Sequence, residues 1–177
     1  MTLFELLDAA ETAGCAGFTL HARFTSQMHG GPVHLDLLAE LVQRAHIPIT
    51  GNGGVHNEET LKAMQDTGVD AVMLGRAAIT NPAIFAAFKG LPFPSRRELY
   101  LRHIDYLLDF QGQLARAFPN DHVPPPDGFV SVALHRHLFH YFRGIPGAAE
   151  LRRRLNLIRT LAETRALAES FPAMQDV

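Results

Sequence analysis

Apolar residues recur along the first half of the chain with two alternating spacings. In three segments they recur every three or four positions, which predicts helices, and between these segments lie short apolar runs that predict strands. The helical segments are 3–13, 34–42 and 57–68, and the strand segments are 17–21, 47–50 and 71–74. This alternation is typical of a parallel sheet with helices on its faces. Because the strand segments are almost continuously apolar, we expect both faces of the sheet to be buried.

Glycines follow the second and third predicted strands. The chain reads Thr50-Gly51-Asn52-Gly53-Gly54 after the second strand and Leu74-Gly75-Arg76 after the third. Glycine lets backbone N–H groups come close to a ligand, and the N-terminus of a following helix attracts an anion. A doubly wound sheet and part of a (β/α)₈ barrel both fit the alternation. Two such ends on successive strands match the phosphate site that barrels build after strands 7 and 8. No G-x-G-x-x-G motif follows a strand, which disfavours a Rossmann site.

Several segments, read together, resemble the C-terminal half of the tRNA-dihydrouridine synthases. In the first half they include His21-Ala22-Arg23, the two glycine-bearing strand ends, and Asn81-Pro82, which also predicts the start of a helix over 83–88. In the second half, residues 136–147 resemble the helical-domain segment of the same family. The resemblance implies the C-terminal part of a TIM barrel over residues 1–94, followed by an all-α helical bundle over residues 95–177. It also implies FMN-dependent reduction of uridine to 5,6-dihydrouridine in tRNA, with NADPH as the reductant.

The resemblance assigns cofactor contacts to six residues at the strand ends. His21 takes the place of a histidine that hydrogen-bonds the flavin, although a histidine here can also simply satisfy a nearby carbonyl. The strand 7 phosphate loop corresponds to Asn52, Gly53 and Gly54, and the strand 8 phosphate clamp to Gly75 and Arg76. Ala22 stands where the family usually has glycine. The neighbouring Arg23 is predicted to contact RNA.

The catalytic cysteine of the family is not found in this sequence. A complete barrel takes about 250 residues, and residues 1–94 correspond only to strands 6–8 and their helices. The single cysteine, Cys15, precedes the first predicted strand, about 17–20 Å from the face where barrels do chemistry. We expect Cys15 to be a small buried hydrophobe and assign no catalytic residue. Three strands alone leave open edges, so the chain is either a fragment of a longer enzyme or is closed by a second copy or a partner.

The second half predicts a separate helical module that contacts RNA. Ser95 caps its first helix with Glu98 at the capping-box position, and residues 118–128 form a proline-rich loop. Further helices follow over 130–142 and from 146 to 170. Tyr141 and Phe142 are expected in the core rather than stacked on a base. The predicted RNA contacts in this half are Arg136, Arg143, Arg152, Arg153 and Arg154.

Charge separates the two halves. Residues 1–94 hold five basic and nine acidic residues, whereas residues 136–165 hold seven arginines and two glutamates. An arginine-rich segment is typical of a phosphate-binding surface, but it also fits a solvated helical face. Two alternatives to the enzyme therefore stay open. One is a catalytically inactive RNA-binding remnant, and the other is a different FMN-binding barrel oxidoreductase without the RNA module.

Composition excludes several other classes. No apolar run approaches the roughly 18 residues of a membrane span, so we expect no membrane association. One cysteine permits no internal disulfide, as expected of a cytoplasmic protein. His29 and His34 flank a Gly-Gly-Pro loop without a cysteine or carboxylate companion, and we therefore predict no metal site.

Overall fold

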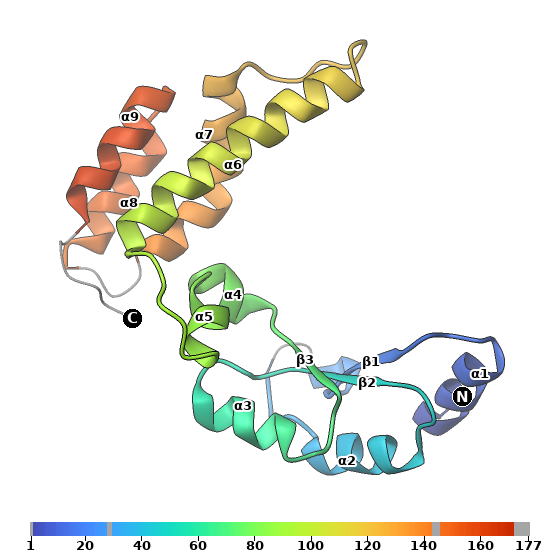
Figure 1. The fold of residues 1–177 in the computed structure, drawn as a ribbon. Helices are drawn as coiled ribbons and strands as arrows, with labels where there is room; N and C mark the ends of the chain where they lie inside the picture. Colours follow the sequence, from blue (N-terminus) through green and yellow to red (C-terminus); the bar gives the residue numbers. More distant parts are fainter. Residues whose placement is uncertain (1, 28–29, 143–145, 172–177) are drawn as a thin grey trace. The chain divides into compact units, whose positions relative to one another are not determined.

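The computed structural model shows an α/β chain with one small parallel sheet and many helices (Figure 1). It describes residues 2–27, 30–142 and 146–171, without the side chains of residues 131, 133–136, 138 and 139. The chain forms two compact units, residues 1–78 and 79–177. The functional domains predicted to meet at residue 94 stay a prediction. None of the helices described is long and apolar enough to cross a membrane.

The first unit alternates helices and strands as the sequence predicts. Its elements are α1 (Leu3–Thr12), β1 (Phe18–His21), the 3₁₀ turn η1 (Thr25–Gln27), α2 (Leu35–Arg44), β2 (Ile49–Asn52), α3 (Glu58–Gln65), β3 (Ala71–Met73) and the start of α4 (Arg76–Thr80). The strands pair in parallel in the order β1-β2-β3. Asn57 caps α3 as predicted, since its Oδ1 accepts a hydrogen bond from the Thr60 N–H at 2.9 Å.

The two faces of the sheet differ, contrary to the prediction that both are buried. On the face toward α2 and α3, Ile49 is buried, and Gly51 lies so close to Met64 that an added Cβ would meet its sulfur at 2.6 Å. Register places three pairs on the opposite face: Thr19 beside Thr50, His21 beside Asn52, and Asn52 beside Met73. These side chains are half-buried or exposed. The prediction was wrong because three strands with their helices cover only one side.

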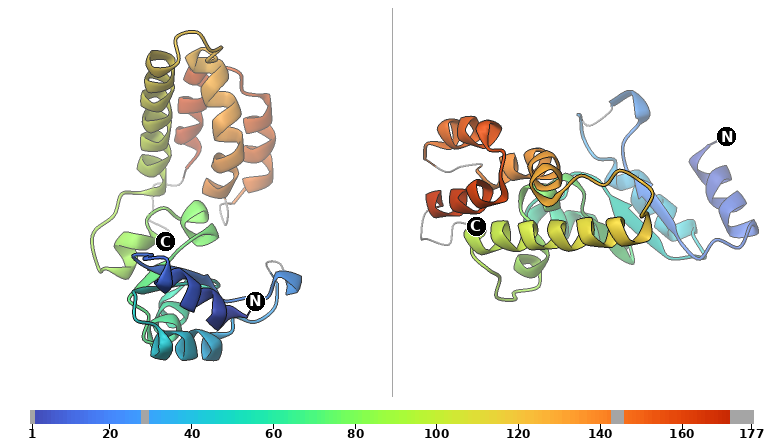
Figure 2. Two further views of the ribbon diagram at one scale, coloured as in Figure 1. Left: turned by 90° about the vertical axis from the view of Figure 1, so that its right-hand side faces the viewer. Right: turned by 90° about the horizontal axis from the view of Figure 1, so that it is seen from above.

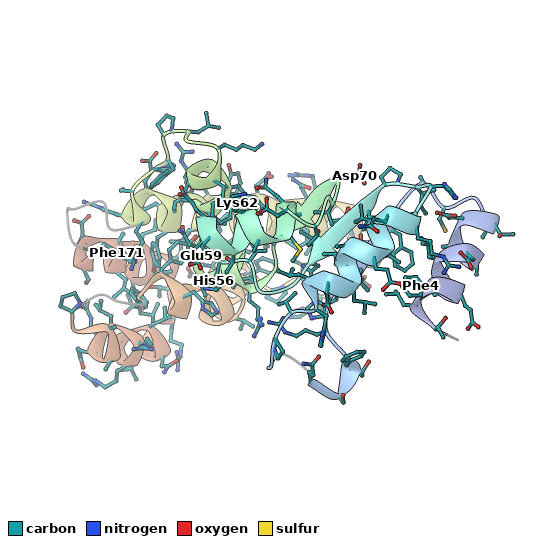
Figure 3. The ribbon with its side chains drawn as sticks, turned by 90° about the horizontal axis from the view of Figure 1, so that it is seen from below. Phe4, His56, Glu59, Lys62, Asp70 and Phe171 are labelled. Carbon is teal, nitrogen blue, oxygen red and sulfur yellow. The ribbon has the colours of Figure 1, made fainter. Side chains whose placement is uncertain are left out.

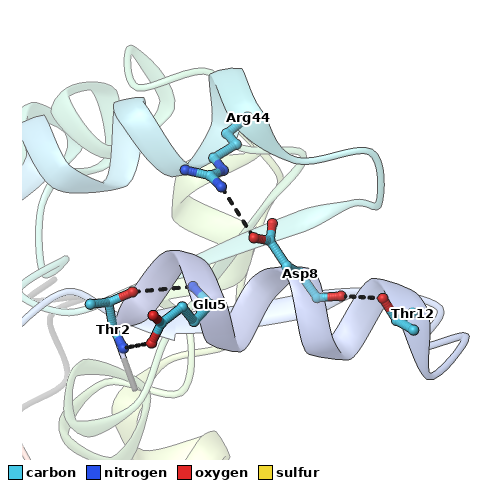
Figure 4. Close-up of polar contacts among 5 residues, drawn as sticks. All are labelled: Thr2, Glu5, Asp8, Thr12 and Arg44. Atoms are coloured by element: carbon cyan, nitrogen blue, oxygen red, sulfur yellow. Dashed lines mark hydrogen bonds and ion pairs between the residues drawn. The ribbon is translucent and has the colours of Figure 1, made fainter.

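Helix α1 is fixed to α2 by polar and aromatic contacts (Figure 4). Thr2 and Glu5 form a reciprocal capping box at its N-terminus. Asp8 pairs with Arg44 of α2 at 3.1 Å, and the Arg44 guanidinium lies over the Phe4 ring at 5.1 Å. The first helix therefore packs beside the second instead of covering the open sheet face.

The second unit is helical. After the end of α4 it contains α5 (Ile84–Phe88), α6 (Arg96–Ala117), α7 (Pro126–Tyr141), α8 (Ala148–Leu157), α9 (Leu161–Ala166) and the 3₁₀ turn η2 (Leu167–Ser170). Helices α6 and α7 run side by side (Figure 2). Ser95 caps α6 as predicted, by accepting from the Glu98 N–H at 3.2 Å. The Glu98 carboxylate pairs with Arg102.

Three boundaries in this unit differ from the prediction. Two short helices replace the single one expected after the third strand, because the Asn81 side chain accepts from the Ala83 N–H and holds a turn between them. The proline-rich loop ends at Pro125, since Pro126 is tolerated as the first residue of α7. The last helical stretch breaks at Ile158, after which Thr160 caps α9.

Aromatic rings build the core of the second unit. Phe142 stacks on Phe171 at 5.3 Å between ring centroids, and Tyr100 packs against both rings. The Tyr100 hydroxyl donates to the Thr164 carbonyl at 2.7 Å, and burial raises the pKa of Tyr100. Burial also raises the pKa of Tyr141 to about 12. The assignment of Tyr141 and Phe142 to the core is therefore confirmed.

Candidate functional site

A chain of hydrogen bonds crosses the carboxyl ends of all three strands. His21 Nδ1 lies 2.5 Å from Asn52 Oδ1, and the Asn52 amide nitrogen donates to the Met73 carbonyl at 2.8 Å. Because the Asn52 Oδ1 can only accept, His21 Nδ1 is the donor in this contact. Because β1 and β2 are parallel and in register at these residues, His21 and Asn52 are held side by side on the open sheet face.

Gly53 and Gly54 form the turn that follows β2. Their φ angles are +128° and +73°, which residues with a Cβ rarely adopt. A Cβ at Gly54 would also meet Val33 at 2.7 Å. His56, which precedes α3 by two residues (Figure 3), lies with Nδ1 2.6 Å from the Gly54 carbonyl oxygen.

Arg23 lies against this turn. A Cβ built on Gly53 would lie 3.5 Å from Arg23 Nη1, and one built on Gly54 would lie 3.5 Å from Nη2. Arg23 Nε donates to the Gly31 carbonyl at 3.2 Å, which fixes the guanidinium. Nη1 is buried, with no hydrogen-bond partner among the described residues. From the sequence Arg23 is predicted to contact RNA, and its position along the chain gives no sign that it lies near these glycines.

Gly75 and Arg76 follow β3, the strand next to β2. A Cβ at Gly75 would meet nothing within 4 Å, so the backbone is approachable there. Arg76 is exposed and is the first residue of the short helix α4. Since β2 and β3 are parallel neighbours, Gly75 and Arg76 follow a strand end adjacent to that of Gly53 and Gly54. Their predicted role as cofactor contacts stays a prediction.

Cys15 lies before β1, at the opposite end of the strands from His21. Asp70, just before β3 (Figure 3), also belongs to that end and accepts from the Ile49 N–H at 2.8 Å. Cys15 is exposed, so the prediction of a buried residue was wrong. The loop between α1 and β1 leaves it uncovered. The four residues of β1 separate the two ends by about 13 Å at 3.3 Å per residue.

The arginines of α8 do not share one face. Consecutive helical residues point about 100° apart, because an α-helix has 3.6 residues per turn. Arg153 makes two 2.7 Å contacts with Glu150, whose pKa is lowered by that hydrogen bond. Arg154 donates to Ser170 at 3.2 Å, and Arg152 donates to the Ala148 carbonyl at 3.0 Å. All three are exposed. The Arg136 side chain and Arg143 lie outside the described residues, and the RNA-contact assignments stay predictions.

Of the two histidines around the Gly-Gly-Pro loop, His29 and His34, the structure describes only His34. His34 Nε2 lies 3.0 Å from Gln27 Oε1, and its ring packs on Phe24 with centroids 4.6 Å apart. His29 lies outside the described residues. Among the residues that are described, no three metal-ligating side chains form a group that could hold a metal ion.

The family model and the similar proteins found by comparison all name the same family, the dihydrouridine synthases. The family model described as "Dihydrouridine synthase (Dus)" matches residues 1–176. A probable tRNA-dihydrouridine synthase of Mycobacterium leprae is 33% identical over 91% of this chain and 42% of its own length. The tRNA-dihydrouridine synthase B of Pseudomonas aeruginosa is 27% identical over 94% of this chain and 50% of its own length. The chain thus spans about half the length of these relatives or less.

Proposed function

Because this chain belongs to the dihydrouridine synthase family, we propose that it supplies the flavin-phosphate site and a tRNA-binding surface of an FMN-dependent tRNA-dihydrouridine synthase. The family fold is a TIM barrel, and the parallel order β1-β2-β3 fits strands 6–8 of such a barrel. One observation carries the proposal. His21, Asn52 and the Gly53–Gly54 turn meet at the end of one strand pair, and Gly75 and Arg76 follow the adjacent strand.

The residues at this edge fit a phosphate-bearing cofactor. A phosphate monoester needs backbone N–H donors and a fixed positive charge. Two positive-φ glycines provide a backbone without side chains, and Arg76 provides a guanidinium beside the next strand. FMN, when bound, would supply the hydride that reduces the uracil ring. In this chain, the phosphate would be held by Asn52, Gly53, Gly54, Gly75 and Arg76, while His21 would hydrogen-bond the flavin.

The second unit is the proposed tRNA contact. Exposed arginines on α8 neutralise phosphates, which makes binding strongly salt-dependent. Uridine must leave its stack to meet a cofactor at the sheet edge, and tRNA held by arginines can supply part of that energy. In this family the catalytic cysteine lies in an Asn-x-Gly-Cys-Pro segment, and the 177 residues of this chain contain none. We therefore expect uridine reduction only when a chain that carries the proton-donating cysteine is also present, with NADPH as reductant.

Flavin titration tests the proposal directly. The chain is titrated with FMN, and with riboflavin as the matched ligand that lacks the phosphate, while flavin fluorescence is recorded. We expect saturable 1:1 binding of FMN and much weaker binding of riboflavin. Equal affinities, or no saturable binding of either, would contradict the phosphate site. Binding of tRNA without any flavin would favour the RNA-binding remnant.

A further inference from the structure

Arg23 is half-buried, and one of its guanidinium nitrogens has no partner among the described residues. Its Nη1 is buried without a hydrogen-bond partner in the described part of the chain, and no described carboxylate forms an ion pair with it. Burying an unpaired N–H of a charged group is costly, so such groups in folded proteins are normally satisfied by protein, water or an ion. The position of this nitrogen therefore points to an anionic partner.

The partner site is the Gly53–Gly54 turn. Arg23 Nη1 and Nη2 each lie 3.5 Å from where a side chain at Gly53 or Gly54 would begin. The N–H groups of Gly53 and Gly54 donate to no acceptor within the described residues. Successive backbone N–H groups of a turn form a concave site for an anion. The Arg23 guanidinium thus provides a fixed positive charge beside the uncharged N–H donors of Gly53 and Gly54.

An RNA contact fits this geometry poorly. Arg23 Nη1 is covered by protein, so it does not face the solvent from which a tRNA backbone would approach. Nε is also engaged by the Gly31 carbonyl, which holds the side chain toward the turn. The loop itself is braced by Gln27, whose Oε1 accepts from the Phe24 N–H at 2.8 Å. Arg23 is therefore part of a preformed structure at the sheet edge.

We propose that Arg23 binds the phosphate monoester held at the Gly53–Gly54 turn, and that this anion, not RNA, is its partner. Where the monoester is FMN, the inference rests on the proposed function. Arg23 then approaches the phosphate from the β1 side, and Arg76 lies beyond the opposite neighbour, β3. The planar fork of arginine donates two N–H groups to one phosphate, which lysine cannot reproduce.

The test compares the wild-type chain with Arg23→Gln and Arg23→Lys, and uses Arg44→Gln as the control. Arg44 belongs to the same unit but pairs with Asp8 on an exposed surface. Melting temperature is measured with inorganic phosphate and with chloride at equal ionic strength. FMN, riboflavin and tRNA affinities are measured for each variant.

We expect phosphate to raise the melting temperature of the wild type and of Arg44→Gln, but not of Arg23→Gln. Loss of charge-assisted hydrogen bonds should weaken FMN binding by Arg23→Gln roughly ten- to a hundredfold, with riboflavin and tRNA affinities unchanged. Arg23→Lys should fall between wild type and Arg23→Gln. If Arg23→Gln fails to fold, the affinities of Arg23→Lys are compared with those of the wild type instead.

The outcomes separate this inference from the proposed function. If FMN is preferred over riboflavin equally in wild type and Arg23→Gln, the role of Arg23 is overturned and the flavin site stands. If phosphate stabilisation depends on Arg23 while FMN is not bound, Arg23 is an anion ligand and the flavin proposal fails. A wild type that phosphate does not stabilise and that does not prefer FMN overturns both. If Arg23→Gln loses affinity for tRNA but still binds phosphate, Arg23 is an RNA contact and this inference is overturned.

Discussion

The two units bury their apolar residues in different ways. In residues 79–177, helices α6–α9 surround Tyr100, Phe142 and Phe171, and these rings are packed on several sides. In residues 1–78, apolar side chains fill the space between one sheet face and its helices, while Met73 on the other face is 51% exposed. Helices can enclose a core from several directions, but a parallel sheet needs cover on both faces. The helical unit therefore closes its own core, and the sheet unit does not.

The open face is also the face of the candidate site. His21 and Asn52 lie on it, side by side at the carboxyl ends of β1 and β2. A surface that is incomplete as a core can still carry an ordered polar arrangement, because the hydrogen bonds across β1, β2 and β3 depend only on local register. The geometry of the site therefore does not require that the open face of the sheet be covered.

The largest expected effect is in the helical core. Phe142→Ala removes a buried ring that stacks on Phe171, and should destabilise the second unit by about 3–5 kcal/mol. All three tyrosines lie in residues 79–177, so tyrosine fluorescence during urea unfolding reports on that unit alone. Phe118→Ala is the matched control, because Phe118 is half exposed. A loss below about 1 kcal/mol would mean that the core is not closed as described.

The covered sheet face should respond less strongly. Gly51→Val places a side chain against Met64 and Leu38, which lie 2.6 and 3.0 Å from the position of its Cβ. Such overpacking costs about 1–3 kcal/mol. Thr50→Val, on the opposite face of the same strand, should change stability by less than about 0.5 kcal/mol. Circular dichroism during urea unfolding measures both variants, and equal effects would contradict the difference between the faces.

A smaller effect is expected on phosphate binding at the carboxyl ends of the strands. Arg76→Ala removes the guanidinium after β3 and should weaken FMN binding about tenfold, with riboflavin affinity unchanged. Lys62→Ala, on α3 (Figure 3), is the control, because Lys62 is exposed and pairs with Asp66. Fluorescence titration gives both affinities. Unchanged FMN occupancy in the Arg76 variant would rule out its assigned contact.

The smallest expected effect concerns tRNA. Arg152→Ala should lower the slope of log affinity against log salt by about one and weaken binding only a fewfold. Arg153→Ala should have less effect, since Glu150 already neutralises Arg153. Filter binding across a salt series measures both slopes. Equal slopes for wild type and Arg152→Ala would remove Arg152 from the RNA surface.

Much of the fold could be predicted from local patterns. Apolar spacing located the alternating elements of the first unit, and Asn57 and Ser95 cap helices through side-chain hydrogen bonds that depend on nearby residues. The burial of Phe142 also followed from its helical spacing. The boundaries near Asn81, Pro126 and Ile158 were harder, because several local hydrogen-bonding solutions compete there.

Local sequence was enough to predict the order of helices and strands in the first unit, the glycine-bearing strand ends, and the family resemblance that the family model confirmed. The open face of the sheet and the exposure of Cys15 became visible only in the folded chain. The tertiary structure also placed Arg23 against Gly53 and Gly54, thirty residues further along the chain. The physical reason is that spacing and caps act between close neighbours in sequence. Burial and charge compensation depend instead on which distant segments the parallel strand pairing brings together.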